Sequence, residues 1–128
     1  MILVDTMVWV YSAGSKHPEI SRRMAELLRR DEVLGHEFVH GELLLGQGGD
    51  ARKKIVEKYR DLQQAPTTTH GAMLAFVKEH SLANRGIGWV DAHLLAAARA
   101  TGSTLWTEEG PLRKAAAMLG IAYQRGTG

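Results

Sequence analysis

The sequence contains no cysteine, and this absence removes several kinds of chemistry at once. Among its 128 residues no thiol is available to form a disulfide, to bind zinc as a thiolate or to act as a nucleophile. Long apolar runs are also missing, because no stretch approaches the roughly 18 residues that a membrane-spanning helix needs. The apolar opening segment is interrupted by Asp5 and has no basic residues before it, which argues against a signal peptide. We therefore expect a cytoplasmic protein with no membrane partner.

Length and composition indicate one folded domain. A chain of 128 residues is long enough to bury a substantial core, and its 45% hydrophobic and 23% charged residues are typical of globular proteins. The sequence shows neither an internal repeat nor a linker. We predict a single domain over residues 1–124, followed by a flexible tail at 125–128.

The charge balance is nearly even but leaves two interpretations open. Sixteen Lys and Arg residues face fourteen Asp and Glu residues, and the isoelectric point is about 9.1. If four of the fourteen acids were held in a metal site, ten acids would share the surface with sixteen bases. Such a surface suits a polyanion. The alternative is an ordinary solvated surface with a slight excess of positive charge.

The hydrophobic pattern alternates between short apolar runs and longer segments with helical spacing. We predict strands at residues 1–4, 33–34, 104–107 and 121–123, with a further short strand possible just before Pro66. Helices are predicted at 18–30, 37–45, 51–62, 70–80, 89–101 and 111–119, while residues 6–17 are assigned to no element. This alternation is typical of an α/β fold with a parallel sheet covered by helices.

Four acidic residues lie in or beside apolar segments. Asp5 ends the opening run, Glu42 and Asp91 interrupt apolar helices, and Glu109 follows Leu105-Trp106-Thr107. Burying an unpaired carboxylate costs several kcal/mol, so these acids require a cation or a proton nearby. If they converge in space, a hard divalent metal is the natural partner.

Fold geometry brings the four acids toward one place. In an open parallel sheet, ligands bind beyond the carboxyl ends of the strands, where Asp5 and Glu109 would both lie. At 100° per residue, Glu42 and Asp91 fall on the apolar faces of their helices. A cluster of oxygen ligands selects Mg²⁺ or Mn²⁺ over zinc, and such metals activate water and neutralise charge on a phosphodiester. The pattern predicts metal-dependent phosphodiester hydrolysis.

Each acid also has a simpler explanation. Asp5 could cap a turn together with Thr6, and Asp91 could be a helix-start residue favoured by the helix dipole. Glu109 could be the acidic start of the next helix, and Glu42 could form a buried ion pair with an arginine. That all four arise in this way by coincidence is less expected than any one of them.

A second motif competes for the metal. His36-Glu37-Phe38-Val39-His40 matches the zinc metalloprotease pattern H-E-x-x-H, with Glu57 available as a third ligand. Glycines at 35 and 41 flank the motif, and His36 could precede the helix, which would break the required spacing. Zinc proteolysis therefore stays a minor alternative. His93 is expected to pack between helices, and Trp9, Trp89 and Trp106 are expected to wall the acidic site as core residues.

Four segments resemble the PIN-domain ribonucleases, and among them the VapC-type toxins of bacterial toxin–antitoxin pairs. They are Ile2-Leu3-Val4-Asp5-Thr6-Met7-Val8-Trp9, Gly41-Glu42-Leu43 followed by Gly46, Gly88-Trp89-Val90-Asp91-Ala92-His93-Leu94-Leu95-Ala96, and Leu105-Trp106-Thr107-Glu108-Glu109-Gly110-Pro111-Leu112. Each segment alone is a loose match, but four in this order and spacing are a strong one. With the order of the elements, the resemblance covers essentially the whole chain.

The resemblance implies a PIN-like α/β/α sandwich with a central parallel sheet, and Mg²⁺ or Mn²⁺ held by Asp5, Glu42 and Asp91. It also implies RNA cleavage that inhibits translation, a homodimer, and a VapB-type antitoxin that binds a groove near the site. At the position of Glu109 the family usually has Asp, so Glu108 is an alternative ligand there.

Other positions bear on how the site would work. Thr6 and Thr107 are expected to orient the carboxylates through their hydroxyls. Met7 stands where the family favours Ser or Asn, and with Glu109 it motivates a second reading, a catalytically weak PIN-type domain that binds RNA or a partner. Candidate contacts to the RNA backbone are Arg22, Arg23, Arg52, Lys53, Lys54 and Arg85.

Overall fold

The structure is a computed structural model that describes residues 1–46 and 49–124. The predicted flexible tail at 125–128 lies outside the described residues. In chain order the elements are β1 (Ile2–Val4), α1 (Thr6–Ala13), α2 (Pro18–Arg29), β2 (Val33–Leu34), α3 (Glu37–Leu45), α4 (Asp50–Tyr59), α5 (His70–Glu79), α6 (Trp89–Ala100), β3 (Thr104–Trp106) and α7 (Gly110–Met118).

The sheet has three parallel strands in the order β2-β1-β3. Ile2 of the central strand pairs with Val33 on one side and Thr104 on the other. Nearly every strand residue is buried, as expected for a parallel sheet covered on both faces. The parallel arrangement brings the carboxyl ends of β1 and β3 to the same edge.

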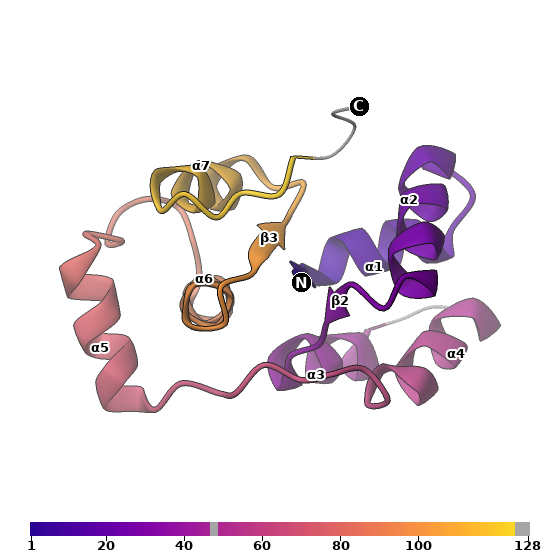
Figure 1. Cartoon of the computed structure of the whole chain (residues 1–128), viewed down its shortest axis with the longest axis horizontal. Coiled ribbons are helices and arrows are strands. Elements are labelled where there is room, and N and C mark those ends of the chain that lie inside the picture. The colour runs from indigo at the N-terminus through magenta and orange to yellow at the C-terminus, as the bar shows by residue number, and fades with distance from the viewer. Residues whose placement is uncertain (47–48, 125–128) are drawn as a thin grey trace.

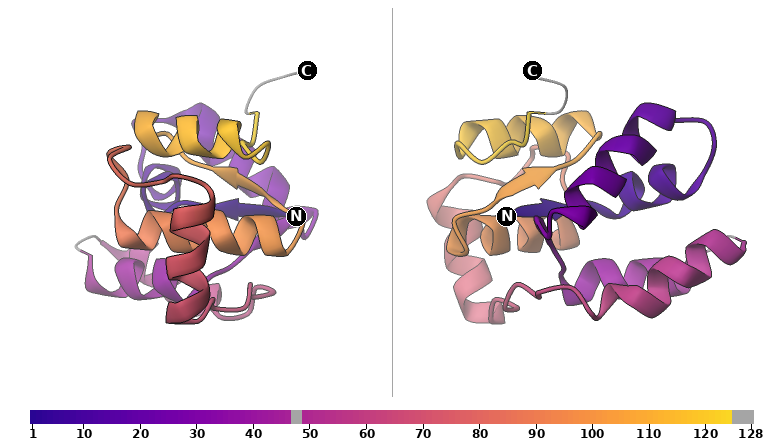
Figure 2. Two further views of the ribbon diagram at one scale, coloured as in Figure 1. Left: turned by 90° about the vertical axis from the view of Figure 1, so that its left-hand side faces the viewer. Right: turned by 45° about the vertical axis from the view of Figure 1, so that its right-hand side comes forward.

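Helices form a layer on each face of this sheet (Figures 1 and 2). Helix α6 packs against β1 and β3 from one side, and α7 covers the opposite side. Helix α5 packs on the outside of α6, where Met73 contacts Ala92 and Ala96. The predicted α/β/α sandwich with a parallel sheet is therefore confirmed. Across the described residues, no helix combines the length and apolarity needed to cross a membrane.

Helix α1 is the element that the sequence pattern missed. Asp5 is its N-cap, in an extended conformation, and its Oδ1 accepts a hydrogen bond of 2.8 Å from the Thr6 amide. The segment behind this cap is apolar almost throughout, because α1 packs against three other helices and buries Val8 and Trp9. An apolar segment of this kind has no hydrophilic face, and therefore no helical period for the sequence to show.

Two predicted edge strands shrink to single bridges. Residues 121–123 meet β3 only at Leu105 and Ala122, where the Leu105 amide donates to the Ile121 carbonyl and the Tyr123 amide donates to the Leu105 carbonyl. The segment before Pro66 likewise contacts the β2 side only through Gly35 and Gln64. The prediction of a full strand at 121–123 was wrong, because the pairing there does not extend beyond this bridge.

Candidate metal-binding active site

Asp5 occupies the buried centre of the candidate site. It lies where β1 ends and α1 begins, and only 5% of it is exposed to solvent. Its Oδ1 accepts from the Thr6 amide, and its Oδ2 accepts from the Thr107 hydroxyl, both at 2.8 Å. Burial raises the pKa of Asp5 to about 6; these two hydrogen bonds oppose the rise, while the charges of Glu109 and Asp91 add to it. The three carboxylates therefore lie within electrostatic reach of one another.

Asp91 and Glu109 approach this centre from two other helices. Asp91 lies in the first turn of α6, where its Oδ2 accepts from the Gly88 amide at 3.0 Å. Glu109 is the N-cap of α7, and its amide donates to the Thr107 hydroxyl at 3.1 Å. The hydroxyl of Thr107 thus connects Asp5 with the backbone of Glu109, which confirms the predicted contact between this threonine and the acids.

Three of the four acids therefore stand at helix N-termini. Asp5 begins α1, Asp91 begins α6 and Glu109 begins α7. The partial positive charge at each helix start favours a carboxylate there. The simpler explanations in the sequence, a capping Asp5 and helix-start acids at 91 and 109, are correct. They do not displace the metal hypothesis, because the same three helix starts are what bring these carboxylates together.

Glu42 takes a different position from the predicted one. We expected it in the middle of the apolar face of α3, but the side chain is exposed, and this prediction was wrong. The buried stripe of α3 is narrow and holds only Val39 and Leu43, which leaves Glu42 beside it. The carboxylate instead reaches α1, where the Thr6 hydroxyl donates to its Oε1 at 2.5 Å. Thr6 therefore joins Glu42 to the helix that Asp5 caps.

The alternative of an ion pair between Glu42 and an arginine is not seen among the described residues. The Arg52 guanidinium donates instead to the backbone carbonyls of Leu43, at 3.2 Å, and Glu42, at 3.5 Å. It lies against Gly46, where a Cβ would fall 1.6 Å from one of its nitrogens. Arg52 therefore stabilises the carboxyl end of α3, and a side chain at position 46 would displace it.

The four acids have no Lys or Arg partner within the described part of the chain. The ion pairs found there involve Glu19, Glu26, Glu79 and Glu108 instead. Within residues 1–46 and 49–124, no three acidic or histidine side chains already stand close enough together to hold a metal ion. Each site carboxylate instead takes up a hydrogen bond, to Thr6, Thr107 or Gly88, or faces solvent.

This donor set fits Mg²⁺ or Mn²⁺ in its chemistry. It consists of carboxylate oxygens, two of them on residues outside the core, and includes neither thiolate nor imidazole. An uncompensated negative cluster around a buried carboxyl of raised pKa is an arrangement that a divalent cation stabilises. Glu42 and Glu109 are both exposed, so the outer side of the site is open to an incoming ion.

Glu108 has a structural role and points away from the acids. Its Oε2 accepts from the Trp106 indole at 3.1 Å and lies 3.5 Å from the Arg113 guanidinium. Glu109, by contrast, is exposed and acts electrostatically on Asp5. Of the two glutamates that the sequence left open, the geometry favours Glu109 as the fourth carboxylate of the site.

Comparison with known proteins identifies the family of the chain. No family model matches the chain. Two curated relatives, each named Ribonuclease VapC32, come from Mycobacterium tuberculosis strains CDC 1551 / Oshkosh and ATCC 25618 / H37Rv. Each is 38% identical to the chain over 123 residues, which cover 95% of this chain and 95% of the relative. The chain belongs to the VapC-type ribonuclease family. The predicted PIN-like fold and the resemblance to this family are both confirmed.

The H-E-x-x-H motif of this VapC-type chain is not arranged as a zinc site. His36 is the N-cap of α3 and not part of the helix, so the two histidines lack the geometry of a zinc helix, as the flanking glycine suggested. Its Nδ1 accepts from the Phe38 amide, whereas its Nε2 is buried without a partner. Glu37 is exposed, and His40 stacks on Tyr59 with ring centroids 5.3 Å apart. The motif serves to start α3 and pack it.

The tryptophans divide into two groups. Trp9 and Trp106 are buried core residues, as predicted, with 4% and 1% exposure. Trp89 is 44% exposed, so the prediction that it walls the site as a core residue was wrong. His93 does pack between helices, with its ring edge-on to Phe38 at 4.6 Å. The sequence could not separate these tryptophans, because each of the three has an apolar residue next to it.

The basic residues that were predicted to contact RNA differ in their exposure and in the contacts they make within the chain. Lys53 and Lys54 are exposed along α4, and Arg22 is exposed on α2. Arg23 lies 3.8 Å from Glu26, and the Nε of Arg85 donates to the Ser81 carbonyl. Arg52 carries the helix-end contacts described above. The exposed lysines of α4 are therefore better suited to contact a polyanion than Arg52 is.

Proposed function

We propose that this chain is a Mg²⁺- or Mn²⁺-dependent endoribonuclease and the toxin of a toxin–antitoxin pair. The observation that carries the proposal is the acidic site, with a buried Asp5 and neighbouring carboxylates that no Lys or Arg of the described residues neutralises. Membership of the VapC-type ribonuclease family supports RNA as the substrate. Inhibition of translation in the cytoplasm is the expected consequence of cleaving RNA that the ribosome needs.

The residues of the site divide the work. Asp5 and Asp91 are the proposed principal ligands, and Glu42 and Glu109 complete the set from the exposed side. When bound, the ion would supply an activated water and neutralise charge on the scissile phosphate. Thr107 fixes the orientation of Asp5 through a 2.8 Å hydrogen bond, and Thr6 fixes that of Glu42. The chain itself thus orients two of the four proposed ligands, Asp5 and Glu42, before any ion arrives.

An RNA cleavage assay tests this proposal. Incubation with total RNA and a panel of structured RNAs, in Mg²⁺ or Mn²⁺, is expected to give discrete fragments that disappear with a chelator. Asp5→Asn preserves the size of the side chain and an acceptor for Thr107 but removes the charge, so it should abolish cleavage. His40→Gln is the matched control and should cleave normally. Intact RNA across the whole panel, with tight RNA binding, would instead support the catalytically weak binding domain that Met7 and Glu109 suggest.

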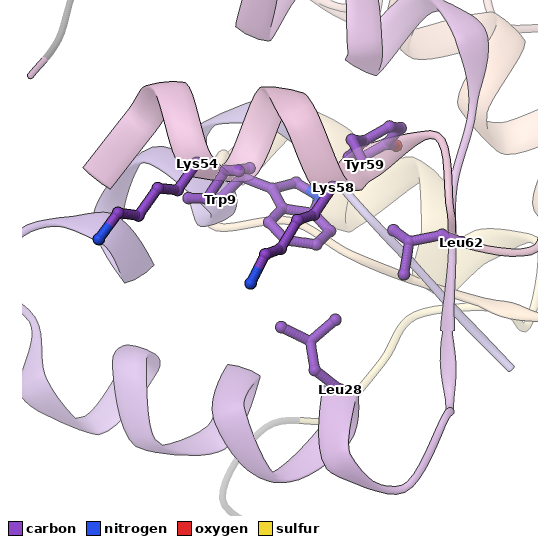
Figure 3. A pocket seen from close by; sticks show the side chains of 7 residues that line it. Trp9, Leu28, Lys54, Lys58, Tyr59 and Leu62 are labelled. Atoms are coloured by element: carbon purple, nitrogen blue, oxygen red, sulfur yellow. The ribbon is translucent and has the colours of Figure 1, made fainter. Parts of the chain in front are cut away.

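An apolar cavity between α2 and α4 is the proposed antitoxin site. It has a volume of about 290 Å³ and lies between Leu28 of α2 and the aromatic pair Trp9 and Tyr59 (Figure 3). The indole Nε1 of Trp9 is buried without a hydrogen-bond partner, and Lys54 and Lys58 extend along the rim from α4. The apolar lining and the two lysines suit a segment that carries an apolar side chain and flanking acids.

A charged substitution at this cavity gives a direct test of the antitoxin proposal. The protein encoded next to this chain would be co-purified with it, and the affinity of the pair measured. Leu28→Arg places a charge on a side chain that is 40% exposed, so the fold should tolerate it while binding falls more than tenfold. Met118→Arg, on the exposed side of α7, is the control and should bind normally. Equal affinity of the two variants would exclude this cavity as the antitoxin site.

We also propose that the chain forms a homodimer. Sedimentation of the same samples would measure it.

A further inference from the structure

Trp89 is an exposed aromatic ring that the fold does not need. Its exposure is 44%, whereas Trp9 and Trp106 are 4% and 1% exposed. Among the large apolar side chains that are exposed in the described part of the chain, it is the only aromatic one. An indole buries more apolar surface than most side chains when it packs into a core, so leaving one in water forgoes much stabilisation. A tryptophan in this position is expected to contact a binding partner of the protein.

The exposed ring is held in place by two imidazoles. His93, one helical turn later, meets it edge-on with centroids 5.1 Å apart and an interplanar angle of 80°. His70, the first residue of α5, lies 5.5 Å away at 51°. His93 is itself buried and contacts Phe38 of α3. The indole is therefore braced from two helices, so a ligand that stacks on it would lose little entropy by ordering it.

Trp89 and the proposed metal ligand Asp91 leave the same turn of α6. Trp89 is the first residue of the helix and Asp91 the third, which separates them by about 3 Å along the helix axis. At 100° per residue they project from opposite sides of that turn. A strand whose phosphate lay at the carboxylates would have to cross the start of α6 to reach the ring. The stacked base would therefore belong to a nucleotide further along the strand than the cleaved bond.

The surroundings of the ring favour a nucleic acid over a protein partner. The exposed residues shortly before it in sequence are Arg85, Gly86 and Gly88, and the exposed His70 lies beside it in space. A protein interface usually presents a contiguous apolar patch with a polar rim, whereas this is one ring among donors and glycines. Aromatic rings beside positive charge are the usual platform for unpaired bases.

We propose that Trp89, braced by His70 and His93, is a stacking platform for an unpaired base of the RNA substrate. The proposal rests on the proposed ribonuclease function, since it places the platform beside that active site. It predicts a preference for single-stranded segments or loops, because a base inside a duplex has no free face to offer. It also assigns substrate selection to a residue that is not a metal ligand.

Intrinsic fluorescence tests the platform directly, because the other two tryptophans are buried. The Asp5→Asn protein would be titrated with short single-stranded oligoadenylate and oligouridylate and with a duplex of the two. Stacking should quench the exposed indole with the single strands and not with the duplex. Trp89→Ala in the same background should bind single strands roughly tenfold more weakly, the loss expected for one stacked base. Trp89→Phe should recover most of the affinity, whereas Trp89→Leu, which keeps apolar bulk without a π-face, should not.

The matched control is Met118→Ala, which removes another exposed apolar side chain from α7 and should bind like the parent. Equal binding by the parent and Trp89→Ala would overturn the platform, as would failure of the parent to bind either single strand. A change in self-association at Trp89→Ala without a change in RNA affinity would also overturn it, and would assign the ring to a protein contact. Because binding is measured in a protein lacking Asp5, failure of the nuclease proposal would appear separately, as intact RNA with the unsubstituted chain.

Discussion

Two regions of this molecule carry residue types that commonly bind metals in proteins, and their structures differ. In the acidic site, Asp91 and Glu109 act electrostatically on Asp5, and Glu42 reaches the start of the same helix α1 through Thr6. In the H-E-x-x-H segment, His36 and His40 are neighbours in sequence but are used for capping and ring packing. The first region buries a carboxylate, that of Asp5, whereas the glutamate of the second region, Glu37, is exposed to solvent.

The difference shows that the spacing of residues in a motif indicates function less well than the energetic cost of placing a charged residue where it stands. Asp5 is buried with a raised pKa, so the fold gives up stability to keep a carboxylate there. Nothing comparable applies to Glu37, which is exposed on the first turn of α3, where the helix dipole favours an acid. A costly position is therefore a better indication of function than a matching motif.

Cleavage rates should separate the two regions by the widest margin. Asp91→Asn keeps an acceptor for the Gly88 amide, so helix α6 should still begin normally, but the ligand charge is lost. We expect the rate of RNA cleavage to fall about a hundredfold or more, whereas His40→Gln should stay within about twofold of the parent. Rates would be measured on one defined RNA with matched Mg²⁺. A similar loss in both variants would assign catalysis to the histidine segment as well.

Acid should change the stability of the two regions in opposite directions. The pKa of Asp5 rises on folding to about 6, so the native state binds a proton that the unfolded chain releases, and this group destabilises the fold as pH rises toward 7. Burial lowers the pKa of His36, with a further contribution from His93, so that group destabilises the fold as pH falls through the ordinary histidine range.

Urea unfolding in a chelator, between about pH 4 and pH 7.5, would measure both effects. Asp5→Asn should raise the free energy of unfolding at pH 7 by up to about 3 kcal/mol, at roughly 1.4 kcal/mol per pKa unit. The gain should shrink as the pH approaches 4, where the carboxyl of the native parent is protonated and that of the unfolded chain begins to be. His36→Gln should flatten the loss of stability on the acid side. A variant at position 5 that is less stable than the parent at pH 7 would show that the buried carboxylate is not strained.

Divalent ions should stabilise the fold by binding at the acidic site, and the histidines of the H-E-x-x-H segment should not be needed for this effect. At a Mg²⁺ or Mn²⁺ concentration a hundredfold above the dissociation constant, binding to the native state adds about 2.7 kcal/mol to the free energy of unfolding. We expect this gain in the parent and in His40→Gln, and its loss in a protein carrying both Asp5→Asn and Asp91→Asn. Thermal unfolding with and without each ion gives the measurement. Stabilisation that survives the double substitution would place the ion elsewhere.

Much of the fold was predictable because its signals are local. Buried parallel strands appear as short apolar runs, and the helices from α2 onward show a helical period or an N-terminal signal such as Pro18. Helix α1 was missed because it is apolar on nearly every side, so that its sequence has no period. The strand predicted at 121–123 was wrong because only tertiary pairing decides whether a bridge extends.

The positions of the four acids could be predicted from the sequence only in part. Asp5, Asp91 and Glu109 could be placed because the ends of strands and the starts of helices follow from local pattern. The exposure of Glu42 could not, because helical angles give a face but not the width of the stripe that neighbours cover. The exposure of Trp89 was equally hidden, since its contacts come from His70 on another helix.

The adjacent residues Glu108 and Glu109 allow a local test of which acids belong to the acidic site, with the smallest expected effects. Glu108 is held by the Trp106 indole at 3.1 Å and by Arg113 at 3.5 Å, whereas Glu109 is exposed and faces Asp5 electrostatically. Glu108→Gln should lower the free energy of unfolding by about 1 kcal/mol, because a charged hydrogen bond becomes a neutral one, and should leave cleavage nearly unchanged.

Glu109→Gln should have the reverse effect. Stability should stay within about 0.5 kcal/mol of the parent, because the side chain is exposed and makes no cap hydrogen bond, while cleavage should fall severalfold. Glu109→Asp, which restores the shorter acid usual in the family, should retain activity and shows whether one methylene matters. If Glu108→Gln is the variant that loses cleavage with its stability intact, the fourth carboxylate of the site is the one held by Trp106. The acidic region would then extend along β3 and not toward α7.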